Sequence, residues 1–251
     1  MKHSVCRWCF QSFFPLPEFC REVKALGYVS VEILKPSEWK VVQDAGLTCA
    51  VGMDSFCSIP NGFNNPNLHA SLQENYLRFI RQAGENGVPA VICFSGNRNG
   101  LSDELGLENC ARGLDPLLRE AEKNGVVLLM ELLNSYIDHK DYQCDHTAWG
   151  AALVQKLGST QFKLLYDIYH AQVMEGNIAN TILKYQDVIG HYHTAGLPGR
   201  NEIDDSQELN YTFLARTIRE TGYTGYLGQE FIPTSGKPLE SLREALAICS
   251  R

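Results

Sequence analysis

The chain has 251 residues, of which 44% are hydrophobic and 20% are charged, and its formal net charge at pH 7 is −7. This acidic balance argues against a nucleic-acid partner, because such proteins usually present a basic surface. No apolar run approaches the roughly 20 residues that a membrane-spanning helix needs, and the first ten residues lack the apolar core of a signal peptide. We therefore expect a cytoplasmic protein that binds neither nucleic acid nor membrane. Whether copies associate into a homo-oligomer is left open.

The nine cysteines are odd in number and scattered, which argues against a disulfide framework. Cys6 and Cys9 form a C-x-x-C pair, a spacing that also occurs in metal and redox sites. An odd separation within a strand would point the two side chains to opposite faces, and no second pair completes a zinc site. We favour the interpretation that the cysteines are small buried apolar residues.

Eight apolar segments typical of buried strands alternate with eight segments that have the pattern and end signals of helices. The expected strands cover residues 4–10, 28–33, 48–53, 89–94, 126–130, 162–166, 188–193 and 225–228. The expected helices cover residues 17–26, 36–44, 68–85, 102–123, 146–157, 178–185, 209–221 and 239–249. This alternation predicts a parallel sheet with crossover helices. Eight such units in about 250 residues predict an α/β protein with a single (β/α)8 TIM-barrel domain over residues 1–251.

The connections between the expected elements are asymmetric. Long loops follow the carboxyl ends of strands, at residues 57–67, 97–101, 134–145 and 194–208, whereas the connections from helices to strands are short and centred on glycines. In TIM barrels the loops at the carboxyl ends of the strands carry the active site. The asymmetry therefore supports the barrel and indicates where its site lies.

Four successive expected strands, the fifth to the eighth, end on a polar ligand type: Glu131, Asp167, His193 and Glu230. Each of these residues alone has another explanation, since an acid after a strand can cap the next helix and a histidine can be a satisfied core residue. Together they are hard to explain as caps, because burying unpaired charge in apolar strands is costly. Three carboxylates and one imidazole suit one divalent ion, such as Mn²⁺, Mg²⁺ or Co²⁺, and Zn²⁺ is also compatible with this set.

Four further residues are candidates for substrate binding. His170 follows Asp167 by three residues in the expected loop, where it could reach a ligand or bond to nearby backbone. His191 faces the same way as His193, one layer deeper, and could support the ligands or contact substrate. Arg200 follows a Pro-Gly turn and could bind a carboxylate or phosphate, or remain a solvated loop cation. Asn134 lies in the loop after Glu131 and is the weakest of these predictions.

Two residues at other strand ends have competing interpretations. Glu32 ends the second expected strand and could face the pocket, but we favour a capping or surface role. Trp8 lies near the end of the first expected strand and could form a pocket wall, although packing in the core is the more common position of tryptophan.

Four segments of the chain together resemble the hydroxypyruvate isomerase family, within the xylose-isomerase-like barrel superfamily. They are MELLN at 130–134, LLYDIYHAQVMEGN at 164–177, HYHTAGLPGR at 191–200 and GYLGQE at 225–230. The resemblance implies that Glu131, Asp167, His193 and Glu230 bind the metal, and that Glu131 and Glu230 are also the acid/base pair. It also implies that His170 and Arg200 contact substrate. Hydroxypyruvate isomerase-like sequences tend to have Gln where this chain has His193, whereas the epimerases of the superfamily have His.

The function that the resemblance implies is that of a metal-dependent isomerase or epimerase of a small α-hydroxy carbonyl compound, which would be a small-molecule substrate: a sugar, a keto-sugar or a hydroxypyruvate-like acid. The metal would acidify the C–H next to the carbonyl and stabilise an enediolate, while a glutamate moves the proton. Two alternatives remain. One is a non-catalytic metal-dependent sugar-binding protein, since fold does not fix function. The other is an endonuclease IV-like metal nuclease, which the acidic charge disfavours.

Overall fold

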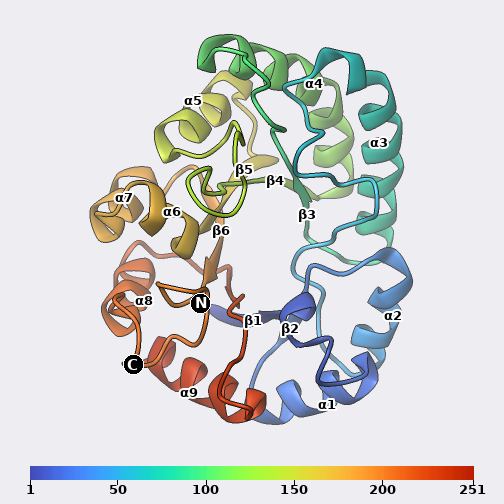
Figure 1. Ribbon diagram of the computed structural model, residues 1–251. Helices are drawn as coiled ribbons and strands as arrows, with labels where there is room; N and C mark the ends of the chain where they lie inside the picture. The colour runs from blue at the N-terminus through green and yellow to red at the C-terminus, as the bar shows by residue number, and fades with distance from the viewer.

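The computed structural model describes residues 1–251 and forms a closed ring of parallel strands inside a ring of helices (Figure 1). The seven strands are β1 Lys2–Cys6, β2 Ser30–Glu32, β3 Ala90–Cys93, β4 Val127–Glu131, β5 Phe162–Asp167, β6 Ile189–Thr194 and β7 Tyr226–Gln229. They are hydrogen-bonded in the order β2-β1-β7-β6-β5-β4-β3, and every pairing is parallel. The carboxyl ends of the strands therefore share one rim, as the predicted α/β barrel requires.

Residues 48–53 close the ring between β2 and β3, but they do so without forming a regular strand. They make isolated bridges to both neighbours, including Leu34 with Gly52 and Gly52 with Val91. The prediction of a regular strand over residues 48–53 is therefore wrong. The backbone N–H of Ala50 donates to the Ser30 side-chain hydroxyl at 3.0 Å, so a side chain takes the place of a backbone partner and the ladder is interrupted.

The helices pack outside the strands (Figure 1). They are α1 Leu16–Leu26, α2 Pro36–Asp44, α3 His69–Glu85, α4 Asp103–Asn124, α5 Thr147–Leu157, α6 Ile168–Met174, α7 Ile178–Tyr185, α8 Tyr211–Glu220 and α9 Pro238–Ser250. Local chemistry explains their ends: Ser102 caps α4 by accepting from the backbone N–H of Leu105 at 3.2 Å, and Gly125 ends the helix with φ of 63°. A core of 68 buried residues fills the space between helices and strands. None of the helices combines the length and apolar character needed to cross a membrane.

Two further sequence predictions about elements are wrong. The first strand ends at Cys6, and the residues expected to continue it form a 3₁₀ helix, Arg7–Phe10. His170 was expected in a loop but lies in the short helix α6. Asp167 starts this helix, because its Oδ1 accepts the backbone N–H of Tyr169 at 2.8 Å. Oδ1 of Asp167 therefore caps the helix, as one of the two explanations predicted, whereas Oδ2 does not take part in the cap.

Candidate active site

The four polar strand-end residues converge at the carboxyl rim of the barrel. Glu131 ends β4, Asp167 ends β5, His193 lies near the end of β6, and Glu230 follows β7 directly. Asp167 is the register partner of His193 in the β5–β6 ladder. All four side chains are buried, and one ligand atom from each lies within 4.8 Å of the corresponding atoms of the other three. Four residues that are spread over 100 positions of the sequence thus form one cluster.

This cluster could hold a divalent metal ion. Ligand atoms about 2.0–2.4 Å from one ion lie no more than about 4.8 Å apart, and the four atoms satisfy that limit. His193 Nδ1 is buried without an aligned hydrogen bond, although Glu230 Oε2 lies 2.8 Å and Glu131 Oε1 3.6 Å away. An unpartnered imidazole nitrogen surrounded by carboxylates is a metal-ligand environment, and the mixed oxygen and nitrogen donors fit the ion expected from the sequence.

Arg200 supplies a positive charge to the same cluster. Its Nη2 donates to Glu230 Oε2 at 2.7 Å and to Asp167 Oδ2 at 3.1 Å, and its guanidinium also lies over the Trp8 ring, 5.3 Å from the centroid. The turn before it aims the side chain inward, and Arg200 itself has φ of 58°. The solvated-cation interpretation of Arg200 is therefore wrong, because its guanidinium is held by buried carboxylates.

The carboxyl groups of the cluster have different electrostatic surroundings. Burial raises the pKa of Asp167 to about 7, with the Glu230 charge adding to this effect and Arg200 opposing it. Burial also raises the pKa of Glu131. Burial acts on Glu230 in the same direction, but the charges of His193 and Arg200 outweigh it and hold the pKa of Glu230 well below its usual range. Positive charge is thus concentrated on the Glu230 side of the site.

His170 points its Nε2 atom at the cluster. Its Nδ1 accepts the backbone N–H of Asn134 at 3.2 Å, so in the neutral ring the proton lies on Nε2. Nε2 lies 3.0 Å from Arg200 Nη1, which is also a donor, and 3.6 Å from Asp167 Oδ2. Two donors in contact would both gain from an oxygen acceptor that lies alongside them. The arrangement is suited to receiving a ligand oxygen.

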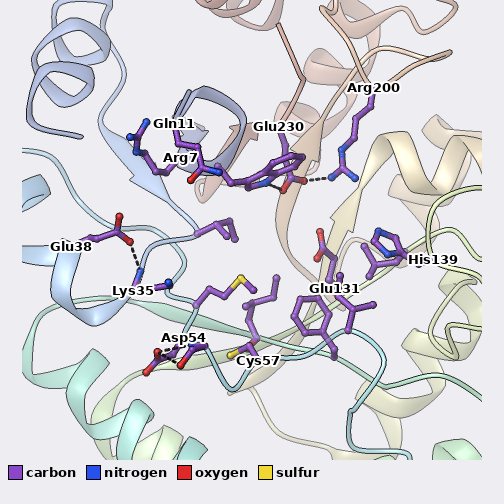
Figure 2. A pocket seen from close by; sticks show the side chains of 18 residues that line it. Arg7, Gln11, Lys35, Glu38, Asp54, Cys57, Glu131, His139, Arg200 and Glu230 are labelled. Carbon is purple, nitrogen blue, oxygen red and sulfur yellow. Dashed lines mark hydrogen bonds and ion pairs between the residues drawn. The ribbon is translucent and has the colours of Figure 1, made fainter. Parts of the chain in front are cut away.

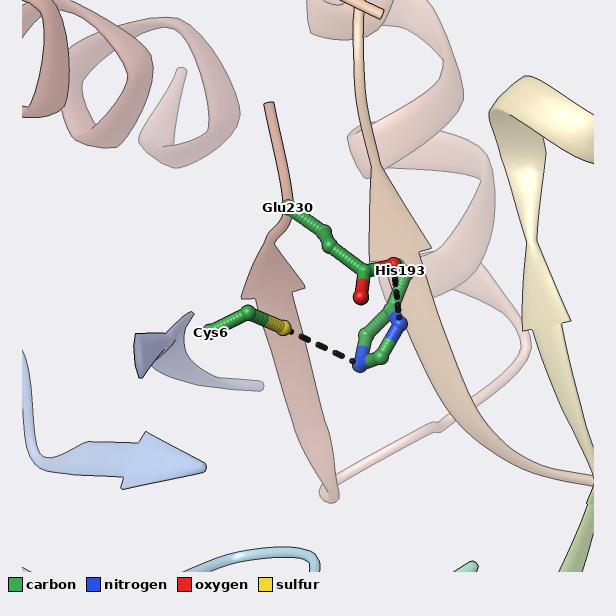
Figure 3. Close-up of side chains that lie close together, drawn as sticks. All are labelled: Cys6, His193 and Glu230. Atoms are coloured by element: carbon green, nitrogen blue, oxygen red, sulfur yellow. Dashed lines mark hydrogen bonds and ion pairs between the residues drawn. The ribbon is translucent and has the colours of Figure 1, made fainter. Parts of the chain in front are cut away.

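A second buried layer lies below His193. His191 Nε2 is 3.0 Å from Glu32 Oε2, and His193 Nε2 is 3.4 Å from Glu32 Oε1 and 3.5 Å from Cys6 Sγ. Figure 3 shows His193 between Cys6 on one side and Glu230 on the other. Burial alone would favour the neutral acid, but the neighbouring histidines hold the pKa of Glu32 at about 2. The surface or capping role expected for Glu32 is wrong, because the side chain is fully buried beside His193.

A cavity of about 470 Å³ opens above the cluster (Figure 2). Glu131, Glu230, Arg200 and His139 lie at one end of the labelled lining, and Arg7, Gln11, Lys35, Glu38 and Asp54 at the other. Apolar side chains that include Ile33, Met53, Ile92 and Phe94 line the walls. A cavity of this size with convergent polar groups at one end is typical of a small-molecule site.

Trp8 also lines this cavity, and its Nε1 donates to Glu230 Oε1 at 2.7 Å. The preference for core packing of Trp8 is therefore wrong, and its role as a pocket wall is what the structure shows. The 3₁₀ helix after β1 turns Trp8 toward Glu230. The strand expected over these residues does not predict this orientation of the side chain.

The structure separates the remaining candidates by position. His170 and Arg200 contact each other beside the four candidate ligands. Asn134 lies behind His170, and none of Asn134, His170 and His191 is among the residues that line the cavity, whereas Arg200 is. The metal-binding, catalytic and substrate-binding roles of all these residues stay predictions.

A parallel barrel with a polar cluster and a cavity at its carboxyl rim defines an enzyme-like α/β barrel. A family model described as "Xylose isomerase-like TIM barrel" matches residues 20–250, and the chain belongs to this family. The predicted fold class is confirmed. The "Crystal structure of AP endonuclease, family 2 from Brucella melitensis" superposes with a TM-score of 0.86, covering 96% of this chain and 97% of that one. At 22% identity this likeness shows the fold alone.

Curated relatives bear on the class of enzyme. A protein of Homo sapiens named "Putative hydroxypyruvate isomerase" is 27% identical over 259 aligned positions, which cover 94% of this chain and 90% of the relative. The "Hydroxypyruvate isomerase" of Escherichia coli strain K12 is 30% identical over 169 positions, covering 67% of this chain and 65% of that protein. These relatives confirm the resemblance found in the sequence motifs and the expectation of an isomerase.

Proposed function

We propose that the protein is a metal-dependent isomerase or epimerase of a small α-hydroxy carbonyl compound: a sugar, a keto-sugar or a hydroxy-keto acid. The observation that carries this proposal is the buried cluster of Glu131, Asp167, His193 and Glu230 at the end of the cavity. The names of the isomerase relatives support the reaction class. We expect the ion to be Mn²⁺, Mg²⁺ or Co²⁺, with Zn²⁺ also compatible with the donor set.

A divalent ion held by these four residues would polarise the carbonyl and hydroxyl oxygens of the substrate and acidify the C–H between them. The chain's own glutamates then move the proton. Glu131 and Glu230 both line the cavity and are held on different strands, β4 and the end of β7, so they can address the reacting carbon from two directions. Such positioned acid/base groups contribute roughly 10²–10⁴-fold in rate.

His170 and Arg200 would orient the substrate in this proposal. Both present N–H groups beside the cluster, and a substrate oxygen placed alongside the two nitrogens, which are 3.0 Å apart, could accept from both. Arg200 also donates to Glu230, which helps to keep this carboxylate ionised. Asn134 would fix the orientation of His170 from behind, and His191 would support the layer below His193.

The test is hydrogen exchange at carbon. The protein is incubated in D₂O with Mn²⁺ and a panel of α-hydroxy ketones, aldoses and hydroxypyruvate, and carbon-bound hydrogen is followed by NMR. We expect deuterium to enter next to a carbonyl, and Glu230→Gln to reduce this exchange at least 100-fold while the fold is retained. The position of the label separates isomerisation, which labels the adjacent carbon, from epimerisation, which labels the same carbon.

Two outcomes would contradict the proposal. Near wild-type exchange by Glu230→Gln would remove this residue from proton transfer. Metal and sugar binding without exchange across the panel would favour the non-catalytic sugar-binding alternative, and in that case Glu230→Gln and Glu131→Gln would leave sugar-induced stabilisation in place.

A further inference from the structure

Glu32 is a buried carboxylate that the proposed proton transfer does not use. It ends β2 on the opposite side of β1 from β7, it is fully buried, and it does not line the cavity. A buried carboxylate is costly unless charged or hydrogen-bonding partners compensate it. Its side-chain partners are His191, His193 and Cys6, and all three are themselves buried.

The two ring nitrogens of His193 face different environments. Nδ1 faces Glu131 and Glu230, whereas Nε2 faces Glu32 Oε1 at 3.4 Å and Cys6 Sγ at 3.5 Å. A histidine that binds a metal through Nδ1 must carry its proton on Nε2, and this N–H needs an acceptor. An ionised carboxylate is a much stronger acceptor than a thiol sulfur.

The backbone of the neighbouring strand leaves room for this contact. Gly228 in β7 is the register partner of His193. A Cβ atom at Gly228 would lie 1.9 Å from Glu32 Oε1 and 2.8 Å from His193 Cδ2, so any larger residue there would push the carboxylate and the imidazole out of place. A glycine is thus required where Glu32 reaches across the barrel to His193.

We propose that Glu32 is a positioning residue for the metal site: it accepts from His193 Nε2, fixes the tautomer and orientation of this imidazole, and directs Nδ1 at the ion. His191 Nε2 lies 3.0 Å from the second oxygen of Glu32, without an aligned hydrogen bond. This inference rests on the proposed function, because it concerns the same metal site.

The experiment measures metal affinity by titrating Mn²⁺ and Co²⁺ into metal-free protein, by calorimetry and by the visible spectrum of bound Co²⁺. Glu32→Gln keeps the size of the side chain but leaves one acceptor oxygen for two imidazoles. We expect the Kd for both ions to rise about 10- to 100-fold and the Co²⁺ spectrum to shift. Glu38→Gln, which removes the same charge at the outer rim of the cavity, should change Kd less than twofold.

A folded Glu32→Gln protein with wild-type Kd and an unchanged Co²⁺ spectrum would overturn the proposal, even if its thermal stability were reduced. If Glu32→Gln does not fold, Gly228→Ala provides the test, since its added methyl group must displace the Glu32 carboxylate; an unaltered Kd in that variant would equally overturn the proposal. If the wild-type protein binds neither ion, the metal site and with it the proposed function are wrong. This outcome differs from an unchanged Kd in Glu32→Gln, so failure of the Glu32 proposal and failure of the proposed function can be told apart.

Discussion

At the scale of single residues, Arg200 determines how the site balances its charge. Its guanidinium bonds to both Asp167 and Glu230 inside a largely buried cluster. Removing one partner from a buried ion pair leaves the other charges uncompensated, at a cost of about 3–5 kcal/mol. A bound metal ion would supply the missing positive charge.

We therefore predict that Arg200→Met lowers the free energy of unfolding of the metal-free protein by about 3 kcal/mol, and that saturating Mn²⁺ restores most of this loss. Urea unfolding in EDTA and in Mn²⁺ measures both values. An equal loss under the two conditions would show that Arg200 stabilises the protein by some means other than neutralising the carboxylates.

The residue scale is also where sequence analysis succeeds and fails most clearly. The four candidate ligands could be found because each polar residue ends an apolar strand, and parallel strand ends meet at one rim. Glu32 has the same local pattern, but its partners lie about 160 residues further along the chain, and only the folded barrel brings them together. A strand pattern predicts the face on which a side chain lies and not the residue it contacts.

At the scale of elements, hydrogen bonds of Glu202 hold the loop that carries Arg200 against the segment before α9. Its carboxylate accepts from the backbone N–H groups of Thr234 and Ser235 at 2.8 and 3.1 Å, from the Thr234 hydroxyl at 2.8 Å and from Ser241 Oγ at 3.1 Å. The loop after β6 is thereby joined to the start of α9. Burial opposes ionisation, but these hydrogen bonds outweigh it and lower the pKa of Glu202 to about 2.

A carboxylate whose pKa is lower in the folded than in the unfolded state stabilises the protein above the unfolded pKa. We predict that Glu202→Gln lowers the free energy of unfolding at pH 7 by about 1.5–3 kcal/mol, and that the difference from wild type disappears as the pH falls from about 4.5 to about 2. Denaturant titrations of wild type and Glu202→Gln at a series of pH values measure this difference in the free energy of unfolding. Glu240→Gln, on the exposed face of α9, should differ from wild type by less than about 0.5 kcal/mol throughout. A pH-independent difference for Glu202→Gln would contradict the assignment.

Elements could be predicted from the sequence where local chemistry defines them. The eight expected helices appear within two residues of their predicted ends, because glycine, proline and capping side chains mark those ends. The errors, at residues 7–10, 48–53 and 168–174, arise where a single side chain or a tertiary contact redirects the backbone. The hydrogen bond between Ser30 and Ala50 is one such contact, and no local pattern reveals it.

At the scale of the whole molecule, the cavity is larger than a three-carbon substrate requires. Hydroxypyruvate has about seven heavy atoms, and at roughly 30 Å³ for each, the share of one water molecule in the liquid, it would fill less than half of 470 Å³. The end of the cavity away from the cluster offers both donors and acceptors, among them Lys35, Gln11, Asp54 and Ser55. Such a mixture matches the hydroxyl groups of a sugar better than a single anion.

We predict that kcat/KM rises from hydroxypyruvate through four-carbon to six-carbon ketoses. Gln11→Ala should raise KM for a six-carbon ketose about 2- to 10-fold, the value of one lost hydrogen bond, and leave the parameters for hydroxypyruvate unchanged. Steady-state kinetics with the substrate series measures both effects. A clear preference for hydroxypyruvate, with no effect of Gln11→Ala on the longer ketoses, would refute the prediction.

At the irregular segment, residues 48–53, the ring of strands is closed by isolated bridges and not by a ladder. The candidate ligands lie on or directly after β4 to β7, which are joined by parallel ladders with one register shift between Leu164 and Leu165. Met53, Asp54, Ser55 and Cys57 of the cavity lining instead lie in or just after a segment held by isolated bridges. Opening of these few bridges would change the outer wall of the cavity while the ladders hold the ligand atoms in place. We expect the cavity wall to adapt at this segment to substrates of different sizes while the ligand atoms keep their geometry.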